Sequence, residues 1–248
     1  MHIWIIGASH GIGAALAKKL AADGHHLALS GRDVAALTAV RDSFPHGYHH
    51  VLPLDVTDDA GFPKAIEHLN AHWPRIDRVI YNSGISPVVT EGIFDPATFR
   101  KVLDVNLIGA FVCASAMLET WKKQGGGHLA MVASVAGYRG LPHALSYCAS
   151  KAGLICLAES LAMELHPLGV KVQVVNPGFV KTRLTDKNDF PMPMMISAEE
   201  AAIAFARGLE KDVFEINFPK RFTFLMKLLS LLPDALYFYV MRRFASGR

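Results

Sequence analysis

Short apolar runs and helix-forming runs alternate along most of the chain, and this alternation restricts the fold more than any other feature. Each apolar run is short and is bounded by Gly, Pro, Asn or Asp, as buried strands are. Such alternation predicts an α/β fold in which a doubly wound parallel sheet of about seven strands has helices on both faces. The expected strands are His2–Ile6, His26–Ser30, Val51–Leu54, Val79–Tyr81, His128–Ala133, Val170–Val175 and Phe214–Phe218, and the expected helices are Gly11–Ala22, Asp33–Ser43, Phe62–His72, Asp95–Leu103, Leu107–Lys123, Ser146–Leu165 and Ser197–Leu209.

A single large domain is expected over residues 1–219. The chain has 248 residues, of which 51% are hydrophobic and 19% are charged, so apolar side chains suffice for a large core. Lengths of this order often form one α/β domain, and no linker, composition shift or repeat interrupts the pattern before about residue 219. Residues 220–248 are interpreted as a separate apolar helical extension.

Charge and cysteine content narrow the class of protein. The net charge of +3 does not indicate nucleic-acid binding, and the 12 His residues show no metal-ligand spacing. Three Cys without a CxxC pair indicate reduced thiols. The sequence shows neither a signal-peptide pattern nor an uninterrupted apolar window of about 20 residues. We therefore expect a cytoplasmic protein without a metal site.

A glycine-rich loop, Gly-Ala-Ser-His-Gly-Ile-Gly at residues 7–13, joins the first expected strand to the first expected helix. Glycines permit a tight turn and close approach of the backbone to a pyrophosphate, while the helix N-terminus offers free N–H groups and partial positive charge. The alternative is a plain glycine turn between a strand and a helix. We predict that the loop binds a dinucleotide through Gly7, Ser9, His10, Gly11, Ile12 and Gly13.

The end of the second expected strand indicates which dinucleotide binds. An NAD site usually has an acidic residue there to hold the ribose 2′-hydroxyl, but this chain has Gly31 followed by Arg32. A guanidinium suits a 2′-phosphate, so we predict NADP, as NADPH or its oxidised form, in preference to NAD. Pairing of Arg32 with Asp33 or with water is the alternative. Further cofactor contacts are expected after the third and fourth strands, at Asp55, Val56, Asn82 and Gly84.

Tyr147 and Lys151 lie four residues apart in a segment expected to be helical, so both side chains project from one face. An ammonium group beside a phenol lowers the phenol pKa from its ordinary value of about 10. A tyrosine of this kind can exchange a proton with a carbonyl or an alcohol oxygen. Ser134 ends an apolar strand, and its hydroxyl could hold that oxygen. The alternative is a surface Tyr–Lys pair and an unrelated Ser turn.

The motifs, taken in the order in which they occur along the chain, resemble those of the short-chain dehydrogenase/reductase family. The matching residues are Gly7–Gly13, Asp55, Asn82–Gly84, Asn106, Ser134, Tyr147–Lys151 and Pro177–Thr182. The resemblance covers roughly residues 1–218 and implies a Rossmann fold. The chain departs from the family pattern at Ile6, where Thr is frequent, and at Ser83, where Ala is usual. It also lacks the usual glycine-rich signature at the seventh strand.

The resemblance implies a role for each matching catalytic position. Tyr147 corresponds to the general acid/base, and Lys151 to the residue that lowers its pKa and binds the nicotinamide ribose. Ser134 corresponds to the anchor of the substrate oxygen. Asn106 corresponds to the residue that holds a water in a proton relay, whereas a helix cap or kink is the alternative for it.

The family pattern also places residues around the nicotinamide. Pro177 and Gly178 correspond to the loop beneath the ring, and Thr182 lies near its carboxamide or the phosphates. The implied activity is NADP(H)-dependent interconversion of a carbonyl and an alcohol. A non-catalytic dinucleotide sensor or scaffold is the alternative. Family members often assemble, so a homo-oligomer is expected through helices corresponding to Leu107–Lys123 and Ser146–Leu165.

Two segments differ from the rest in composition. Arg183–Ser197 corresponds to the substrate lid, and Phe190, Met192, Met194 and Met195 would make it apolar, which suggests a hydrophobic substrate. Lys220–Arg248 is rich in Leu, Phe, Tyr and Met, with Pro233 dividing it, so two short helices are expected. This tail packs on the body, covers the substrate cleft, forms a dimer contact, or lies in a membrane interface as a peripheral anchor.

Overall fold

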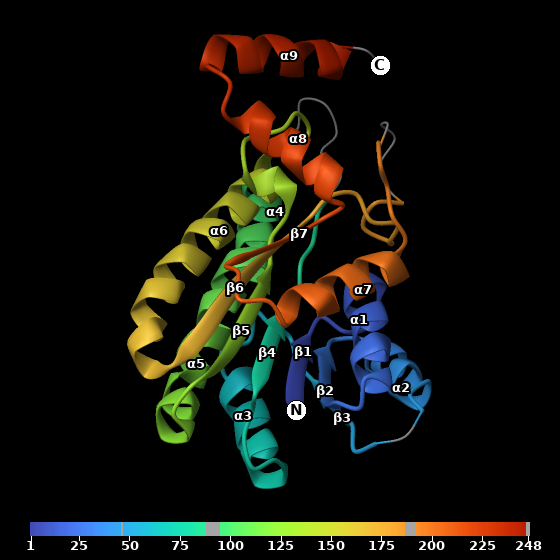
Figure 1. Ribbon diagram of the computed structural model, residues 1–248, viewed down its shortest axis with the longest axis vertical. Coiled ribbons are helices and arrows are strands. Elements are labelled where there is room, and N and C mark those ends of the chain that lie inside the picture. The colour runs from blue at the N-terminus through green and yellow to red at the C-terminus, as the bar shows by residue number, and fades with distance from the viewer. Residues whose placement is uncertain (46, 88–94, 187–191, 247–248) are drawn as a thin grey trace.

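Seven parallel strands form one sheet, as the alternating pattern predicted (Figure 1). In the computed structural model, which describes residues 1–45, 47–87, 95–186 and 192–246, the strand order is β3-β2-β1-β4-β5-β6-β7. The chain crosses over between β1 and β4, and open α/β sheets bind ligands outside the carboxyl ends of the strands at such a point. The strands are β1 His2–Ile6, β2 His26–Gly31, β3 His50–Pro53, β4 Arg78–Tyr81, β5 Gly127–Val132, β6 Val170–Pro177 and β7 Glu215–Phe218.

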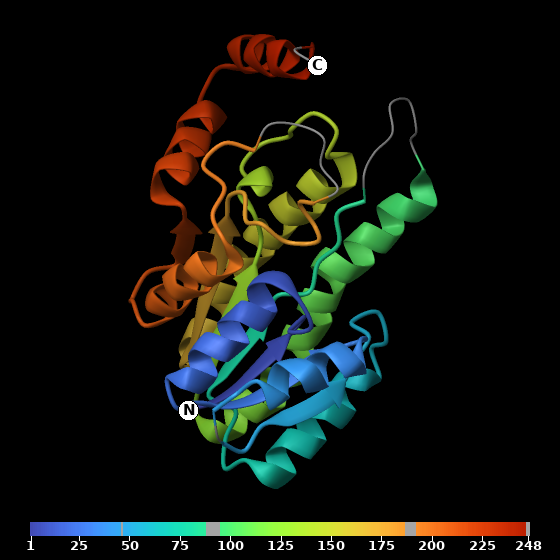
Figure 2. The same ribbon diagram turned by 90° about the vertical axis from the view of Figure 1, so that its right-hand side faces the viewer.

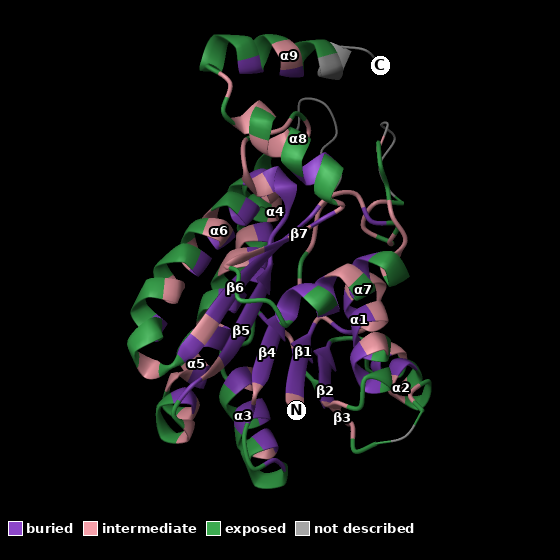
Figure 3. Ribbon diagram, in the orientation of Figure 1, coloured by how far each residue is buried: buried purple, intermediate pink, exposed green. Residues whose placement is uncertain are grey.

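Helices cover both faces of the sheet and bury two apolar cores (Figures 2 and 3). The helices of this body are α1 Gly11–Ala22, α2 Val34–Asp42, α3 Gly61–His72, α4 Pro96–Leu103, α5 Gly109–Gln124, α6 Leu145–Leu165 and α7 Ala198–Leu209. Ile3 and Ile5 of β1 pack in the core that includes residues of α1, α2 and α7. Trp4 and Ile6, which point to the other face, pack with residues of α3, α5 and α6. Burial on both faces explains why the strands are continuously apolar.

Two of the expected helices form one continuous helix. The regions expected at Asp95–Leu103 and Leu107–Lys123 are joined by a π-helical turn, Asp104–Ile108. Among the described residues, the resulting helix, Pro96–Gln124, is the one that is long and apolar enough to cross a membrane, with a mean hydropathy of 1.6 over an 18-residue window. Its side chains Met117 and Trp121 are fully buried in the protein core, which accounts for its apolar composition.

The chain continues after β7 into two helices, as the position of Pro233 predicted. These helices are α8 Lys220–Ser230 and α9 Asp234–Ser246. Both lie at the end of the molecule where the parallel strands finish, and α9 lies beyond α8 (Figures 1 and 2). The tail therefore shares one end of the molecule with the carboxyl edge of the sheet.

Candidate active site

The glycine loop packs against the end of β4 so closely that two of its positions require glycine. A Cβ atom on Gly13 would lie 2.1 Å from the Gly7 carbonyl oxygen. Gly7 itself has a φ of +90°, and a Cβ atom there would lie 2.6 Å from the Ser83 amide nitrogen. The Asn82 side chain donates a hydrogen bond of 2.7 Å to the Gly7 carbonyl oxygen. The two segments predicted to bind the cofactor therefore form one cradle.

The N-terminus of α1 opens beside this cradle. His10 is the N-cap residue, and its side chain makes no capping hydrogen bond to the first turn. The first N–H groups of a helix have no partner within the helix, so they are suited to an anion. Thr182 lies beside the loop, because a Cβ atom on Gly11 would be 3.0 Å from the Thr182 methyl carbon. A close backbone cradle and an uncapped helix end fit the pyrophosphate of a dinucleotide.

The residues after β2 form an exposed edge of the cradle. The Asp33 carboxylate accepts a hydrogen bond of 3.0 Å from Ala36 and lies 3.3 Å from His10 Nε2. It is therefore engaged with the α2 N-terminus and His10. Arg32 is exposed, and a guanidinium nitrogen of Arg183 lies 2.8 Å from His10 Nε2. Two guanidinium groups thus belong to this edge of the site.

Asp55 and Val56 follow β3 near the same edge. Hydrogen bonds from the Thr57 backbone and hydroxyl, at 3.0 and 2.8 Å, engage the Asp55 carboxylate. The backbone hydrogen bond from Thr57 is the main cause that lowers the pKa of Asp55, and the charge of Arg32 adds to it. Val56 is buried, and a Cβ atom on Gly109 would meet its carbonyl oxygen at 2.7 Å. Asp55 is therefore an ionised, oriented side chain, whereas Val56 is also part of the core.

Three predicted catalytic side chains converge at the carboxyl end of the sheet. Ser134 directly follows β5 as the N-cap of a short 3-10 turn, and its hydroxyl accepts a hydrogen bond of 3.1 Å from Ala136. The Ser134 hydroxyl lies close enough to Tyr147 to influence the pKa of its phenol. Lys151, one turn further along α6, donates a hydrogen bond of 2.7 Å to the Val132 carbonyl oxygen. Its Nζ lies 5.7 Å from the centre of the Tyr147 ring.

The pKa of Tyr147 differs from the prediction. Removal from water raises the pKa of Tyr147 to about 12, although the nearby Ser134 hydroxyl acts in the lowering direction. The same burial lowers the pKa of Lys151 to about 7. The prediction that Lys151 lowers the Tyr147 pKa is therefore wrong for this structure, because a buried amine itself loses much of its charge near neutral pH. Tyr147 is a neutral phenol at pH 7, which suits a proton donor.

Burial of Lys151 predicts a pH dependence of stability. Because its pKa falls from 10.5 to about 7 on folding, the unfolded chain binds more protons in this window and stability rises with pH. Between pH 7 and 9, the unfolding free energy should rise by about 2 kcal/mol more in the original protein than in Lys151→Met. Urea unfolding of the cofactor-free proteins measures this difference. The variant Lys64→Met, at an exposed site, should show the same rise of unfolding free energy with pH as the original protein. The same rise in Lys151→Met would contradict the lowered pKa of Lys151.

Asn106 lies in the π-helical turn between α4 and α5. Its side chain accepts a hydrogen bond of 2.8 Å from the Ile85 amide and donates one of 3.0 Å to the Ile85 carbonyl oxygen. It also donates a bond of 2.9 Å to the Ser150 hydroxyl. A Cβ atom on Gly84 would lie 3.4 Å from Lys151 Nζ and 3.5 Å from Asn106 Oδ1. Asn106 is therefore beside Lys151, and it also fastens the segment after β4 to the helices.

The end of β6 brings Pro177 and Gly178 to the same edge, under the start of the tail. The Gly178 amide donates a hydrogen bond of 2.8 Å to the Phe218 carbonyl oxygen. A Cβ atom there would lie 2.5 Å from the Phe222 ring of α8. The first turn of α8 therefore fixes this loop, so the tail contributes to the shape of the site.

Glu215 is a site residue that the sequence interpretation missed. This half-buried carboxylate on β7 accepts hydrogen bonds from Tyr138, which follows the Ser134 turn, and from Lys227 of α8. It also accepts a bond of 2.7 Å from Asn176, the residue before Pro177. Glu215 thus connects the segment after the Ser134 turn, the end of β6 and helix α8. A single acidic residue in a short strand carries no local signal for this arrangement.

The fold and the site define the class of the protein: it is a Rossmann-type α/β protein whose carboxyl edge carries a glycine cradle and a Ser–Tyr–Lys group. Comparison with known families agrees with this class. The family described as short chain dehydrogenase matches residues 1–191. The chain belongs to the short-chain dehydrogenase family and is an oxidoreductase of that family.

Relatives share both the sequence and the fold. An uncharacterized oxidoreductase of Myxococcus xanthus is 34% identical over 241 residues, covering 96% of this chain and 95% of its own. The 3-oxoacyl-(acyl-carrier-protein) reductase MabA of Mycobacterium bovis is 33% identical over 183 residues, which cover 74% of this chain and 70% of MabA. The crystal structure of a short-chain dehydrogenase from Streptomyces avermitilis superimposes with a TM-score of 0.82 and 23% identity, covering 97% and 95% of the two chains.

Proposed function

We propose that this protein is an NADP(H)-dependent oxidoreductase that interconverts a carbonyl and an alcohol on a hydrophobic substrate. The observation that carries the proposal is the convergence of Ser134, Tyr147 and Lys151 beside the glycine cradle. In this proposal Gly7–Gly13, Asn82 and Thr182 hold the phosphates and Arg32 the 2′-phosphate. When bound there, the nicotinamide supplies or accepts the hydride.

Proton transfer is the task of the protein side chains. In the reducing direction, the Tyr147 hydroxyl gives its proton to the substrate oxygen as the alcohol forms, and in the oxidising direction it takes that proton back. The Ser134 hydroxyl, which lies near Tyr147, orients the same oxygen. Lys151, which lies beside Asn106, returns the proton to Tyr147 through water. A Tyr147 pKa of about 12 keeps the phenol protonated at neutral pH, so it has a proton to donate.

Exposed apolar side chains near the site support a hydrophobic substrate. Leu145, two residues before Tyr147, is 47% exposed, and Met194 and Met195 are 51% and 37% exposed. Phe190, which was also assigned to the lid, lies outside the described residues. The relative MabA is named as a 3-oxoacyl reductase, and a β-ketoacyl thioester is one hydrophobic carbonyl compound of this kind.

A panel of ketones, β-ketoacyl thioesters, sterols and sugars, read by NADPH absorbance, tests the proposal. We expect oxidation of NADPH with at least one apolar carbonyl compound. Dinucleotide binding without turnover on the whole panel would instead indicate a sensor or scaffold. The same panel with NADH measures the preference between the two cofactors.

The cofactor assignment predicts the effect of Arg32→Ala. Loss of a charge-assisted contact to the 2′-phosphate should weaken NADPH binding by about tenfold or more, whereas NADH affinity should stay nearly constant. Fluorescence titration with both dinucleotides measures this split. Arg41→Ala, which removes an exposed guanidinium from α2, is the matched control and should bind both as the original protein does. Equal losses for NADPH and NADH in Arg32→Ala would reject the assignment.

We also propose a homo-oligomer formed through α5 and α6. Phe111 on α5 and Met163 on α6 are 52% and 70% exposed, so both helices have apolar side chains at the surface. Light scattering after size-exclusion chromatography tests this, and a monomer at all concentrations would contradict it.

A further inference from the structure

Helices α8 and α9 lie at the end of the molecule that carries the site, and much of both helices is exposed (Figure 3). Many of the exposed residues are large and apolar. We call the exposed surface of the two helices the tail face. Its main apolar members are Phe224 at 63% exposure, Leu228 at 48%, Leu231 at 79%, Leu236 at 47%, Phe238 at 51% and Tyr239 at 55%. Single exposed apolar residues are common, but six large ones on two consecutive helices indicate an interaction surface.

Each helix already packs on the body through its other side. Phe222 and Thr223 of α8 are 5% and 1% exposed, and Tyr237 of α9 is 2% exposed. Arg139, in the loop after the Ser134 turn, stacks on the Tyr237 ring at 3.9 Å and donates to the Ser230 and Leu232 carbonyl oxygens. The helices are therefore fixed, and the tail face is the surface that remains outside.

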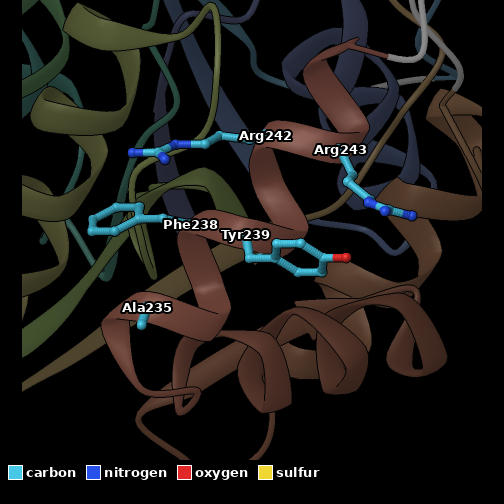
Figure 4. A pocket seen from close by; sticks show the side chains of 5 residues that line it. All are labelled: Ala235, Phe238, Tyr239, Arg242 and Arg243. Carbon is cyan, nitrogen blue, oxygen red and sulfur yellow. The ribbon is translucent and has the colours of Figure 1, made fainter.

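Arginine side chains lie among the exposed apolar side chains of α9. Figure 4 shows Phe238 and Arg242 projecting to one side of α9 and Tyr239 and Arg243 to the other. The Arg243 guanidinium lies 5.2 Å from the centre of the Tyr239 ring. Aromatic and arginine side chains close together on one helix are typical of segments that lie at a membrane–water interface.

Positively charged residues are concentrated in the segment that forms these two helices. Six of the 25 Lys and Arg residues, but one of the 22 Asp and Glu residues, lie in residues 220–248. That segment therefore carries +5 and the rest of the chain −2. The single acidic residue, Asp234, is paired with Arg139. The tail face thus combines positive charge with apolar area, whereas the body is slightly acidic.

We propose that the tail face binds the surface of an anionic phospholipid bilayer. Phe224, Leu228 and Leu231 would enter the acyl boundary, and Arg242 and Arg243 would contact the headgroup phosphates. A second copy of the chain is a poorer occupant, because a self-complementary contact would bring the arginines of two tail faces together. The proposal does not depend on catalytic activity, and it places the candidate active site at the end of the molecule nearest the lipid.

Vesicle flotation of the full chain tests the proposal. We expect flotation with vesicles of phosphatidylcholine and phosphatidylserine, and less with phosphatidylcholine alone. The double variant Leu228→Asp, Leu231→Asp should bind about tenfold more weakly or worse. In the double variant Arg242→Ala, Arg243→Ala, each lost charge should lower the affinity for the mixed vesicles by about fivefold. The weak binding of this variant to neutral vesicles should not change.

Matched controls separate a surface effect from general changes. Tyr48→Asp with Ile203→Asp alters exposed apolar residues elsewhere, and Lys64→Ala with Lys123→Ala removes two distant charges. Both should float as the original protein does. All variants should keep the original NADPH affinity and melting temperature. Failure of the original protein to float, or unchanged flotation of both tail-face variants, would overturn the proposal, as would self-association through this face without lipid binding.

Discussion

Tyr147→Phe should lower kcat by roughly 10²- to 10⁴-fold, the range that a positioned general acid contributes. The substitution removes only the hydroxyl that would give the proton to the substrate oxygen. NADPH affinity should stay nearly unchanged, because the cradle is formed by the glycine loop, Asn82 and Thr182. Steady-state kinetics with a substrate found in the carbonyl panel, together with NADPH titration, measure the two quantities separately.

The substitution keeps the aromatic ring and its packing, so it should change stability by about 1 kcal/mol or less. Unfolding in urea should therefore show a small change, far below what would account for the loss of turnover. Tyr48→Phe, at a side chain that is 81% exposed, is the matched control and should retain full activity. Turnover in Tyr147→Phe equal to that of the original protein would remove Tyr147 from its proposed role.

Gly13→Ala should damage both stability and cofactor binding. The added methyl group would lie 2.1 Å from the Gly7 carbonyl oxygen and 2.6 Å from Asn82 Nδ2, so backbone atoms of the loop would have to move. Overpacking at a rigid backbone position should cost about 3 kcal/mol or more. The movement also breaks the hydrogen bond from Asn82 to Gly7 that closes the cradle. NADPH affinity should fall by more than about tenfold, since charge-assisted contacts to phosphate contribute about 1.5–3 kcal/mol each.

Urea unfolding and fluorescence titration measure these effects. Gly140→Ala is the control, because a Cβ atom there would meet no heavy atom within 4 Å. It should change the unfolding free energy by about 0.5 kcal/mol or less. NADPH binding in Gly13→Ala equal to that of Gly140→Ala would show that the loop is not the cofactor cradle.

Local patterns in the sequence predicted most of the fold. Runs such as His2–Ile6 and Gly11–Ala22 carry their own signals, namely buried-strand composition and helix-forming composition that ends near a glycine. The capping box at Ser197 and Glu200 also depends only on nearby residues, and the structure contains it. The π-helical turn at Asn106 was not predicted, since its cause is a side chain that bonds to Ile85 and Ser150.

Properties set by distant residues were not predictable in the same way. The direction of the Tyr147 pKa shift was wrong because it depends on burial under the assembled fold, which the spacing of Tyr147 and Lys151 does not report. The role of Glu215 depends on Tyr138, 77 positions away, and on Asn176, 39 positions away. The predicted residues of the cradle and the Ser–Tyr–Lys group did come together, because parallel strands bring their carboxyl ends to one edge.

The contacts of Arg139 have a consequence for how the site is completed during synthesis. The loop between Ser134 and Tyr147 is held at its middle by Arg139 and Gly140, whose partners are Ser230, Leu232, Asp234 and Tyr237 near the end of the chain. Domains begin to fold from the N-terminal side while the ribosome is still adding residues. The sheet and the glycine cradle can therefore assemble before the tail has emerged, whereas this loop gains its fixed position only after residues 230–237 have emerged.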